Sequence, residues 1–409
     1  MRLLYASIVF ILLCAPLASR AADNAVKSSS GKKAEDITFI AVGDIMLSRG
    51  ILRMTEKLGN DYPFSEVSTE LNKGDIVFGN LESVLGVKRT KTYFQKPFNF
   101  IAPPESVLSL KDAGFTVLSL SNNHAMDFGP EPIDETRILL GAAGIAYFGA
   151  GQNASEAAEP VYVTVKGVKF AFLGYAIAHD SKVYATSSRA GIISPWDHDR
   201  IRRAVKEVRK NADVVVVSLH WGVEYKLLPE KSDVRLAHKI IDWGADLILG
   251  HHPHVPQGVE EYKGGLIAYS LGNFVFDQRK PDTLLGLMLK IQFSGSRMLS
   301  YEVVPVSRHT TFFPAVANGS ERDRILGKLM DISVPLYASA RWRGVKDKKA
   351  VKGEVMAVKT DNAAPGAKAA VEEAGGAGEA GTEALNRVSS DVVRFAMASG
   401  AAASRKTSL

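Results

Sequence analysis

Short apolar runs of strand length alternate with helix-like stretches through most of this chain. The apolar runs occupy residues 37–42, 75–78, 115–120, 169–173, 214–219, 247–249 and 266–271. The stretches between them predict helices at residues 64–71, 105–113, 131–142, 199–210 and 233–243. This alternation predicts an α/β fold with a mostly parallel sheet and helices outside it. Residues 285–306 are β-like without helices, which predicts a second sheet or a hairpin that closes the core.

Polar side chains follow five of the apolar runs, each at the point where the run ends. These residues are Asp44, then Asn80 and Glu82, then Asn122, Asn123 and His124, then His220, and finally His251, His252 and His254. Open α/β sheets place their sites at the carboxyl ends of the strands. Three of the nine histidines fall within four positions, and imidazole is the commonest side-chain metal ligand. The combination of carboxylates, amides and imidazoles predicts a site for one or two divalent ions.

Several of these side chains also have a purely structural interpretation, as helix caps, solvated loop groups or hydrogen-bonded core histidines. The alternative applies to Asp44, Glu82, Asn123, His124 and His220. An H-x-H pair of ligands needs only His252 and His254, so we expect His251 to support the ligands. Further candidates for lining the pocket or orienting ligands are Asp127, Glu224 and Asn273.

The first 21 residues have the features of a secretory signal, with Arg2, an apolar run at residues 3–17, and the small residues Ser19 and Ala21. We therefore expect a secreted or periplasmic protein, associated with the membrane only if this segment is not cleaved. Cys14 is the only cysteine and lies within the segment. The mature chain would then have neither disulfides nor a catalytic thiol, so any metal must be held by His, Asp, Glu or Asn.

The rest of the chain divides by composition into a linker at residues 22–35, a domain at 36–308, an extension at 309–345 and a tail at 346–409. The low-complexity tail is rich in Ala, Gly, Lys and Glu and cannot bury a core. We expect it to be disordered apart from one short helix near residues 390–398. The net charge of +6 comes without a long basic run, so nucleic acid is not an expected partner, although an anionic ligand is favoured.

Six motifs together resemble those of the CapA (poly-γ-glutamate capsule synthesis) family, which has a calcineurin-like metallophosphoesterase fold. The motifs are GDIMLSRG, GNLES, SNNHAMDFG, SLHWGVEY, ADLILGHHPHVPQG and YSLGNFVFD. The resemblance covers about residues 36–307. It implies a four-layer αββα sandwich of the metallophosphoesterase type, with a metal centre at the strand ends.

Carried over by position, the resemblance also implies a set of metal ligands. Glu82 would bridge two ions. One site would be completed by Asp44 and His254, and the other by Asn123, His220 and His252. The metal would be Mn, Zn or Fe, a choice that the sequence leaves open.

The chain departs from the wider superfamily after its first strand. Metallophosphoesterases usually begin D-x-H, whereas Met46 stands two places after Asp44 here. The second carboxylate is Glu82 rather than the usual aspartate. A site short of one ligand binds more weakly, so we expect one tightly held ion beside Glu82 and His220 and a weaker ion beside Asp44.

The resemblance implies a metal-dependent hydrolase that acts in synthesis or attachment of an anionic envelope polymer such as poly-γ-glutamate, or on a phosphoester, with envelope synthesis machinery as a partner. His124 would be the catalytic acid or electrostatic group near the leaving oxygen. One alternative is a non-catalytic accessory protein that binds polymer in the same cleft, and a third interpretation is a zinc amidase on another α/β fold. Fold alone does not distinguish them. Neutralising Glu82 would distinguish a catalyst from a binding protein, because a catalyst then loses turnover but keeps ligand binding.

Overall fold

The computed structural model describes residues 35–308 and 312–339, with side chains as far as residue 333. The predicted signal at residues 1–21, the short helix near residues 390–398 and the low-complexity tail lie outside the described residues. Among the helices that the structure describes, none combines the length and apolar character needed to cross a membrane.

The first sheet is built around four parallel strands. In spatial order they are β1 (Asp36–Ile45), β2 (Ile76–Leu81), β5 (Val117–Ser119) and β6 (Ala146–Phe148). The β-like residues 285–306 form a hairpin that extends this sheet on the other side of β1. Its strands and the one beyond are β16 (Leu285–Ser294), β17 (Arg297–Ser307) and β18 (Ala315–Val316), all paired antiparallel. A short strand, β15 (Asn273–Val275), pairs with β1 and sets Asn273 opposite Asp44.

The second sheet also has a parallel centre and antiparallel margins. The central strands are β9 (Val168–Ala176), β11 (Val214–His220), β12 (Leu247–His251) and β14 (Gly265–Ala268). The margins are β8 (Val161–Val165) and β13 (Val259–Tyr262). Two small ladders pair β3 (Val84–Leu85) with β4 (Ile101–Ala102) and β7 (Ala150–Gly151) with β10 (Gly191–Ile192). The predicted parallel strands are therefore divided between two sheets.

Side chains along the central strands face alternately the other sheet and the outer helices, as the two-residue period of a strand requires. Phe39 on β1 and Phe78 on β2 face the second sheet, where their ring centroids lie 6.2 and 6.4 Å from that of Phe172 on β9. Ile40 on β1 and Leu173 on β9 instead join the clusters beneath the helices. Burying each large apolar side chain contributes roughly 2–3 kcal/mol, so the two sheets hold each other face to face.

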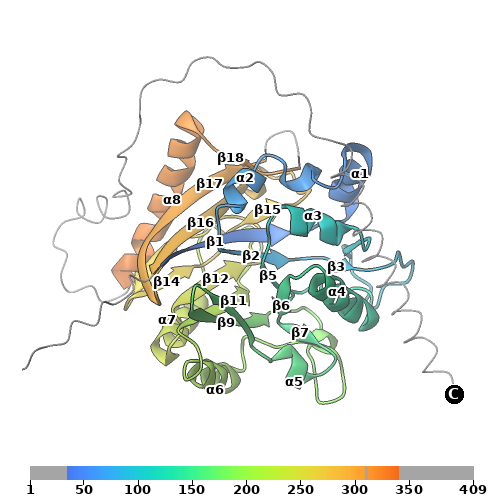
Figure 1. Cartoon of the computed structure of the whole chain (residues 1–409), viewed down its shortest axis with the longest axis horizontal. Coiled ribbons are helices and arrows are strands. Elements are labelled where there is room, and N and C mark those ends of the chain that lie inside the picture. Colours follow the sequence, from blue (N-terminus) through green and yellow to red (C-terminus); the bar gives the residue numbers. More distant parts are fainter. Residues whose placement is uncertain (1–34, 309–311, 340–409) are drawn as a thin grey trace, which may run out of the picture. The chain divides into compact units, whose positions relative to one another are not determined.

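Helices cover the outer face of each sheet (Figure 1). The cluster on the first sheet includes side chains from α1 (Arg49–Leu58), α2 (Ser68–Leu71), α3 (Ser106–Asp112) and α4 (Glu131–Ala142). The cluster on the second sheet includes side chains from α5 (Ala154–Ala157), α6 (His198–Val208) and α7 (Lys231–Trp243). The expected four-layer αββα sandwich is confirmed.

Four helices differ from the sequence prediction, and one of them is the short, unpredicted α5. Of the helix predicted at residues 64–71, only α2 forms, preceded by a 3₁₀ turn at Tyr62–Phe64 that contains Pro63. Helix α1 was not predicted, because no side chain caps its start and its apolar residues fall within only ten positions, at Ile51, Leu52, Met54 and Leu58. Helix α8 (Gly319–Ser339) follows residue 308 and places Leu329 in the core between the sheets.

Candidate metal centre

The polar residues predicted at the strand ends lie together where the carboxyl edges of the two sheets meet. Asp44 lies on β1, and Glu82 directly follows β2. His220 and His251 end two neighbouring strands of the second sheet, β11 and β12. The backbone N–H of His252 donates to Oδ2 of Asp44 at 3.3 Å, so the two edges are joined by direct contact.

Two glycines allow the strand ends to come this close. A Cβ at Gly43, just before Asp44, would lie 1.9 Å from the carbonyl oxygen of Gly272. A Cβ at Gly250, just before His251, would lie 2.0 Å from the carbonyl oxygen of Tyr269. Any side chain at either position would push the polar residue that follows it away from the site.

Asp44, Glu82 and His254 form a buried group of donors. One ligand atom from each lies within 4.8 Å of the other two. Nδ1 of His254 is 3.4 Å from Oδ2 of Asp44, and its Nε2 is 3.7 Å from Oε1 of Glu82. Asp44 and Glu82 are both completely buried. Two buried carboxylates facing one imidazole are suited to a divalent cation.

Glu82 has an unusual environment for a buried carboxylate. Neither of its oxygens accepts a hydrogen bond from any described residue. Burial raises its pKa well above the ordinary value, and the charges of Asp44 and Glu224 raise it further. A buried ionised group normally has a partner, because leaving it unpaired costs several kcal/mol. The orphaned carboxylate therefore fits a cation that binds between it and Asp44.

The pKa of Asp44 is shifted in the opposite direction. Burial raises its pKa, but contacts with His251 and His254 outweigh burial and hold the pKa well below the ordinary value. Nδ1 of His251 lies 3.2 Å from Oδ1 of Asp44, although it is not aligned for a hydrogen bond. Asp44 is therefore ionised near neutral pH, ready to bind a cation.

A second group of donors comprises Asn123, His220 and His252. Nε2 of His220 is 2.9 Å from Oδ1 of Asn123 and 3.1 Å from Nδ1 of His252. Ligand atoms bound to one ion at about 2.1 Å lie about 3 Å apart, so this spacing suits a shared metal. Burial and the charge of His252 lower the pKa of His220 well below its ordinary value, and burial lowers that of His252 to about 3. Both imidazoles are therefore neutral, as metal ligands must be.

The H-x-H turn holds its histidines in a strained backbone. His252 has φ 95° and His254 has φ 59°, on either side of Pro253. Residues other than glycine rarely adopt positive φ, at a cost of about 1–3 kcal/mol each, and such strain clusters at functional sites. The turn points both imidazoles at the donor groups rather than relaxing away from them.

His124 is oriented by a carboxylate three residues further on. Its Nδ1 lies 2.8 Å from Oδ2 of Asp127, and its ring stacks on Phe100 with centroids 4.0 Å apart. Its Nε2 lies 3.7 Å from Oε1 of Glu82. Lys96 forms an ion pair with Asp127 and reaches Nδ1 of His124 at 3.2 Å. Burial lowers the pKa of His124 although Asp127 raises it, so its Nε2 presents a neutral, fixed imidazole edge toward Glu82.

Amide side chains contact the predicted metal ligands and help to hold them in place. Oδ1 of Asn273 lies 2.9 Å from Nδ1 of His254. Nδ2 of Asn80 donates to Oδ1 of Asp44 at 2.8 Å and lies 3.3 Å from Nδ1 of His220. Sequence reasoning placed Asn80 at a strand end but gave it no role. Its signal was its place two residues before Glu82, which puts both side chains on the same side of the chain.

Met46, which stands where an imidazole is usual, does not contribute to the site. Its Sδ accepts hydrogen bonds from the N–H and Oγ–H of Ser48, at 3.2 and 3.0 Å. The side chain is buried in the apolar cluster on the outer face of the first sheet. The donor group beside Asp44 therefore lacks the ligand that this position would have supplied.

The structure thus brings together all six predicted ligands and places His124 beside them. Of the supporting candidates, His251 lies against Asp44, Asp127 against His124 and Asn273 against His254. Glu224 is exposed and acts on the site through its charge. The part that each residue takes in binding a metal stays a prediction.

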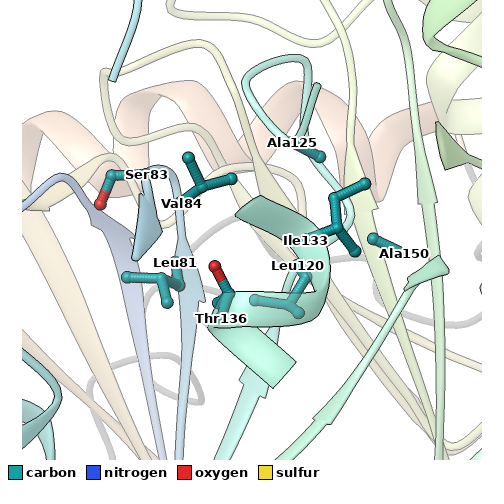
Figure 2. A pocket seen from close by; sticks show the side chains of 8 residues that line it. All are labelled: Leu81, Ser83, Val84, Leu120, Ala125, Ile133, Thr136 and Ala150. Carbon is teal, nitrogen blue, oxygen red and sulfur yellow. The ribbon is translucent and has the colours of Figure 1, made fainter. Parts of the chain in front are cut away.

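Figure 2 shows a small apolar pocket whose lining includes chain neighbours of the site residues. Its lining includes Leu81, next to Glu82 in the chain, and Leu120 and Ala125, on either side of the SNNH motif. Its polar side chains are Ser83 and Thr136, and Oγ1 of Thr136 accepts from the N–H of Leu85 at 2.8 Å. No titratable group lines the pocket. The side chains that line it pack beside the backbone that carries Glu82 and His124.

Fold and site together define the class of protein: an αββα sandwich with buried carboxylates, amides and imidazoles gathered at the strand ends. Residues 38–278 match the family model described as "Bacterial capsule synthesis protein PGA_cap". The chain belongs to this family of bacterial capsule synthesis proteins.

Two named relatives and one solved structure illustrate the similarity. The chain is 36% identical over 354 residues to the capsule biosynthesis protein CapA of Bacillus anthracis, covering 84% of each chain. It is 35% identical to the PGA biosynthesis protein CapA of Bacillus subtilis, covering 74% of this chain and 79% of that one. It is also similar to the NAD nucleotidase of Haemophilus influenzae, with a TM-score of 0.41 at 14% identity over 75% of this chain and 60% of that one.

Proposed function

We propose that this protein is a secreted or periplasmic metal-dependent hydrolase that acts on an anionic envelope polymer such as poly-γ-glutamate. The observation that carries the proposal is Glu82. Its carboxylate is completely buried, has no hydrogen-bond partner among the described residues, and lies between His124 and His254. A carboxylate in this position is costly to the fold unless a cation completes it.

The residues present fit one or two divalent ions of the Mn, Zn or Fe type. Glu82 would be shared, with Asp44 and His254 on one side and Asn123, His220 and His252 on the other. When bound, such ions activate water as a nucleophile and polarise the bond to be cleaved.

The chain's own residues supply the remaining chemistry. Asp127 fixes the ring of His124, so that Nε2 faces the donor groups. In this position Nε2 of the neutral imidazole can accept a proton as water attacks and then pass it to the leaving oxygen, a role worth about 10² to 10⁴ in rate. Lys96 balances the charge of Asp127 and holds it in place.

The substrate class rests on family membership. The family description is a bacterial capsule synthesis protein, and the Bacillus subtilis relative is named for PGA biosynthesis. Secretion rests on the signal-like residues 1–21. A polymer partner and a location outside the cytoplasm are consistent with each other, because a capsule is assembled at the cell envelope.

A second candidate function is a polymer-binding accessory protein without turnover. The observation that favours it is Met46, whose sulfur is bound by Ser48 and adds no ligand beside Asp44. A site that holds only one ion tightly could serve to bind and orient a polymer rather than to cleave it.

Elemental analysis of the purified protein lacking residues 1–21, together with a panel of phosphodiester and γ-glutamyl substrates, tests the proposal. We expect bound divalent metal and turnover of at least one substrate, with turnover lost and polymer binding kept in Glu82→Gln. The matched control is Glu260→Gln, because Glu260 is equally buried but pairs with His238 and Tyr269 away from the site. Metal-loaded protein that binds polymer but turns over no substrate would overturn the hydrolase and favour the accessory protein.

A further inference from the structure

Two groups of cation–aromatic contacts lie next to the donor groups. The guanidinium carbon of Arg49 is 5.2 Å from the ring centroid of Phe98 and 5.1 Å from that of Phe100. The ammonium of Lys280 is 3.6 Å from the ring centroid of Tyr225. Contacts of this kind fix the cation and the ring relative to each other.

One loop joins the two pairs. Asp277 accepts hydrogen bonds from Nε of Arg49 at 3.1 Å and from the N–H of Gly50 at 3.0 Å, and Lys280 follows three residues later. The buried guanidinium of Arg308 donates to the carbonyl oxygens of Phe276 and Thr283 on the same loop. The positions of Arg49 and Lys280 are therefore set by a loop with anchored ends.

Both pairs touch residues of the proposed metal centre. Phe100 stacks on His124, and the ring centroid of Tyr225 is 6.3 Å from that of His254. Burial raises the pKa of the Tyr225 phenol, and Glu224 raises it further. The charges of Glu82 and Arg49 also act on it, so the two pairs lie within electrostatic reach of each other and of the site. The pairs form a rim, comprising Arg49, Phe98, Tyr225 and Lys280.

The rim is available to a ligand. Phe98 is 59% exposed and Tyr225 is 38% exposed, so part of each side chain is open to solvent. Lys280 is exposed and forms no ion pair with any residue that the structure describes. Tyr225 has φ 65°, a strained conformation that its N–H stabilises by donating to the carbonyl oxygen of Pro253 at 2.8 Å.

We propose that this rim binds a polyglutamate chain beside the metal centre, with Lys280 contacting a carboxylate and the rings of Phe98 and Tyr225 packing on the neighbouring methylene and amide groups. The inference rests on the proposed function, because it names the residues that select the substrate of the same site. A glutamyl polymer carries both carboxylates and apolar methylenes, and the rim offers a cation without an ion-pair partner among the described residues, Lys280, together with two partly exposed rings. A phosphate polymer has no apolar groups for the rings to cover.

The test of the rim is the affinity of the full chain for a fluorescently labelled γ-linked glutamate oligomer. Fluorescence anisotropy measures this binding. Lys280→Met removes the charge but keeps the length of the side chain, and Phe98→Ala removes an exposed ring. We expect each to weaken binding about fivefold, which matches the loss of about 1 kcal/mol. The control is Lys169→Met, because Lys169 lies 4.5 Å above the ring of Tyr162 at the opposite end of β9, about 20 Å from the site edge.

A competition with polyphosphate separates this rim from a general cationic surface. We expect Phe98→Ala to weaken the glutamate oligomer but not polyphosphate, because only the glutamyl chain packs on the ring. Equal loss for both polymers, or wild-type binding by Lys280→Met and Phe98→Ala, would overturn the inference. To make both outcomes independent of turnover, the titrations are repeated in the Glu82→Gln background, which is expected to bind polymer without cleaving it, and mass spectrometry of each sample checks that the probe is intact. If binding depends on the rim but no substrate is hydrolysed, the proposed hydrolase activity is overturned and the proposed binding rim is kept.

Discussion

His220 and Asn123 meet across the two sheets: Nε2 of His220, at the end of β11, lies 2.9 Å from Oδ1 of Asn123, which follows β5 of the other sheet. Neither element positions a ligand group alone. The donor set is complete only where the two carboxyl edges come together.

We expect His220→Ala to abolish the tighter metal site, because the imidazole contacts both Asn123 and His252. Titration calorimetry on metal-stripped wild type should give two unequal affinities, the weaker beside Asp44. The variant should lose the tighter one by more than about 100-fold, beyond the 10–100-fold typical of losing a supporting group. His238→Ala, which removes an imidazole paired with Glu260 elsewhere, should keep both. Two equal, tight sites in the wild type would mean that another ligand is present.

His124→Ala should leave metal content and thermal stability nearly intact while lowering turnover by about 10² to 10⁴. The reason is that its Nε2 faces Glu82 without being needed to complete either donor group. Asp127→Asn should also lower turnover, because it releases the imidazole ring of His124. Steady-state kinetics and elemental analysis of the same preparations check this. Unfolding or loss of metal in His124→Ala would show that the histidine is a structural residue.

Glu82→Gln should stabilise the metal-stripped protein. The buried carboxylate has no partner and a raised pKa, so the folded state is penalised for carrying its charge near neutral pH. The thermal midpoint should rise by about 2–4 °C for each kcal/mol gained. With metal added, the order should reverse, because the wild type gains more from the ion. A metal-free variant less stable than the wild type would show that Glu82 has a partner in solution.

Acidification should destabilise the metal-stripped protein. The pKa values of His124, His220 and His252 are lowered on folding, so below pH about 6.5 the unfolded chain binds more protons and stability falls with pH. Between pH about 6.5 and its folded-state pKa of about 3, His252 lowers the free energy of unfolding by about 1 kcal/mol for each pH unit of acidification.

The measurement is urea unfolding at pH 7.5 and 5.5. Glu82 has the opposite sign, because its raised pKa favours the folded state as pH falls, so the series is made in the Glu82→Gln background. Adding His252→Asn should reduce the pH dependence. Equal stability at both pH values would contradict the burial of neutral imidazoles.

Local patterns account for the elements and for the ligands at their ends. An apolar run followed by a polar residue was enough to place Asp44, Glu82 and His220, because parallel strands deliver their ends to one edge. The spacing of three residues between His124 and Asp127 was likewise visible. The division of strands into two sheets was beyond local pattern, since pairing partners are set by contacts distant in the chain.

Other parts of the site have no local signal. Lys96 approaches His124 from a loop that joins β3 to β4, and nothing in its neighbouring residues indicates that destination. Tyr225 lies at positive φ, which residue type alone would argue against. Asn80 was in the right place, but a buried amide between two ligands cannot be told from a strand-end turn without coordinates.

The ligands extend from residue 44 to residue 254, on strands that belong to different sheets. A partly synthesised or partly folded chain has no two-sheet edge, and so has nothing with which to retain an ion. Loading of the proposed metal centre would therefore follow folding rather than guide it. The identity of the ion would then be decided by which metals are present in the compartment where the chain completes its fold, more than by the intrinsic preferences of its imidazoles and carboxylates.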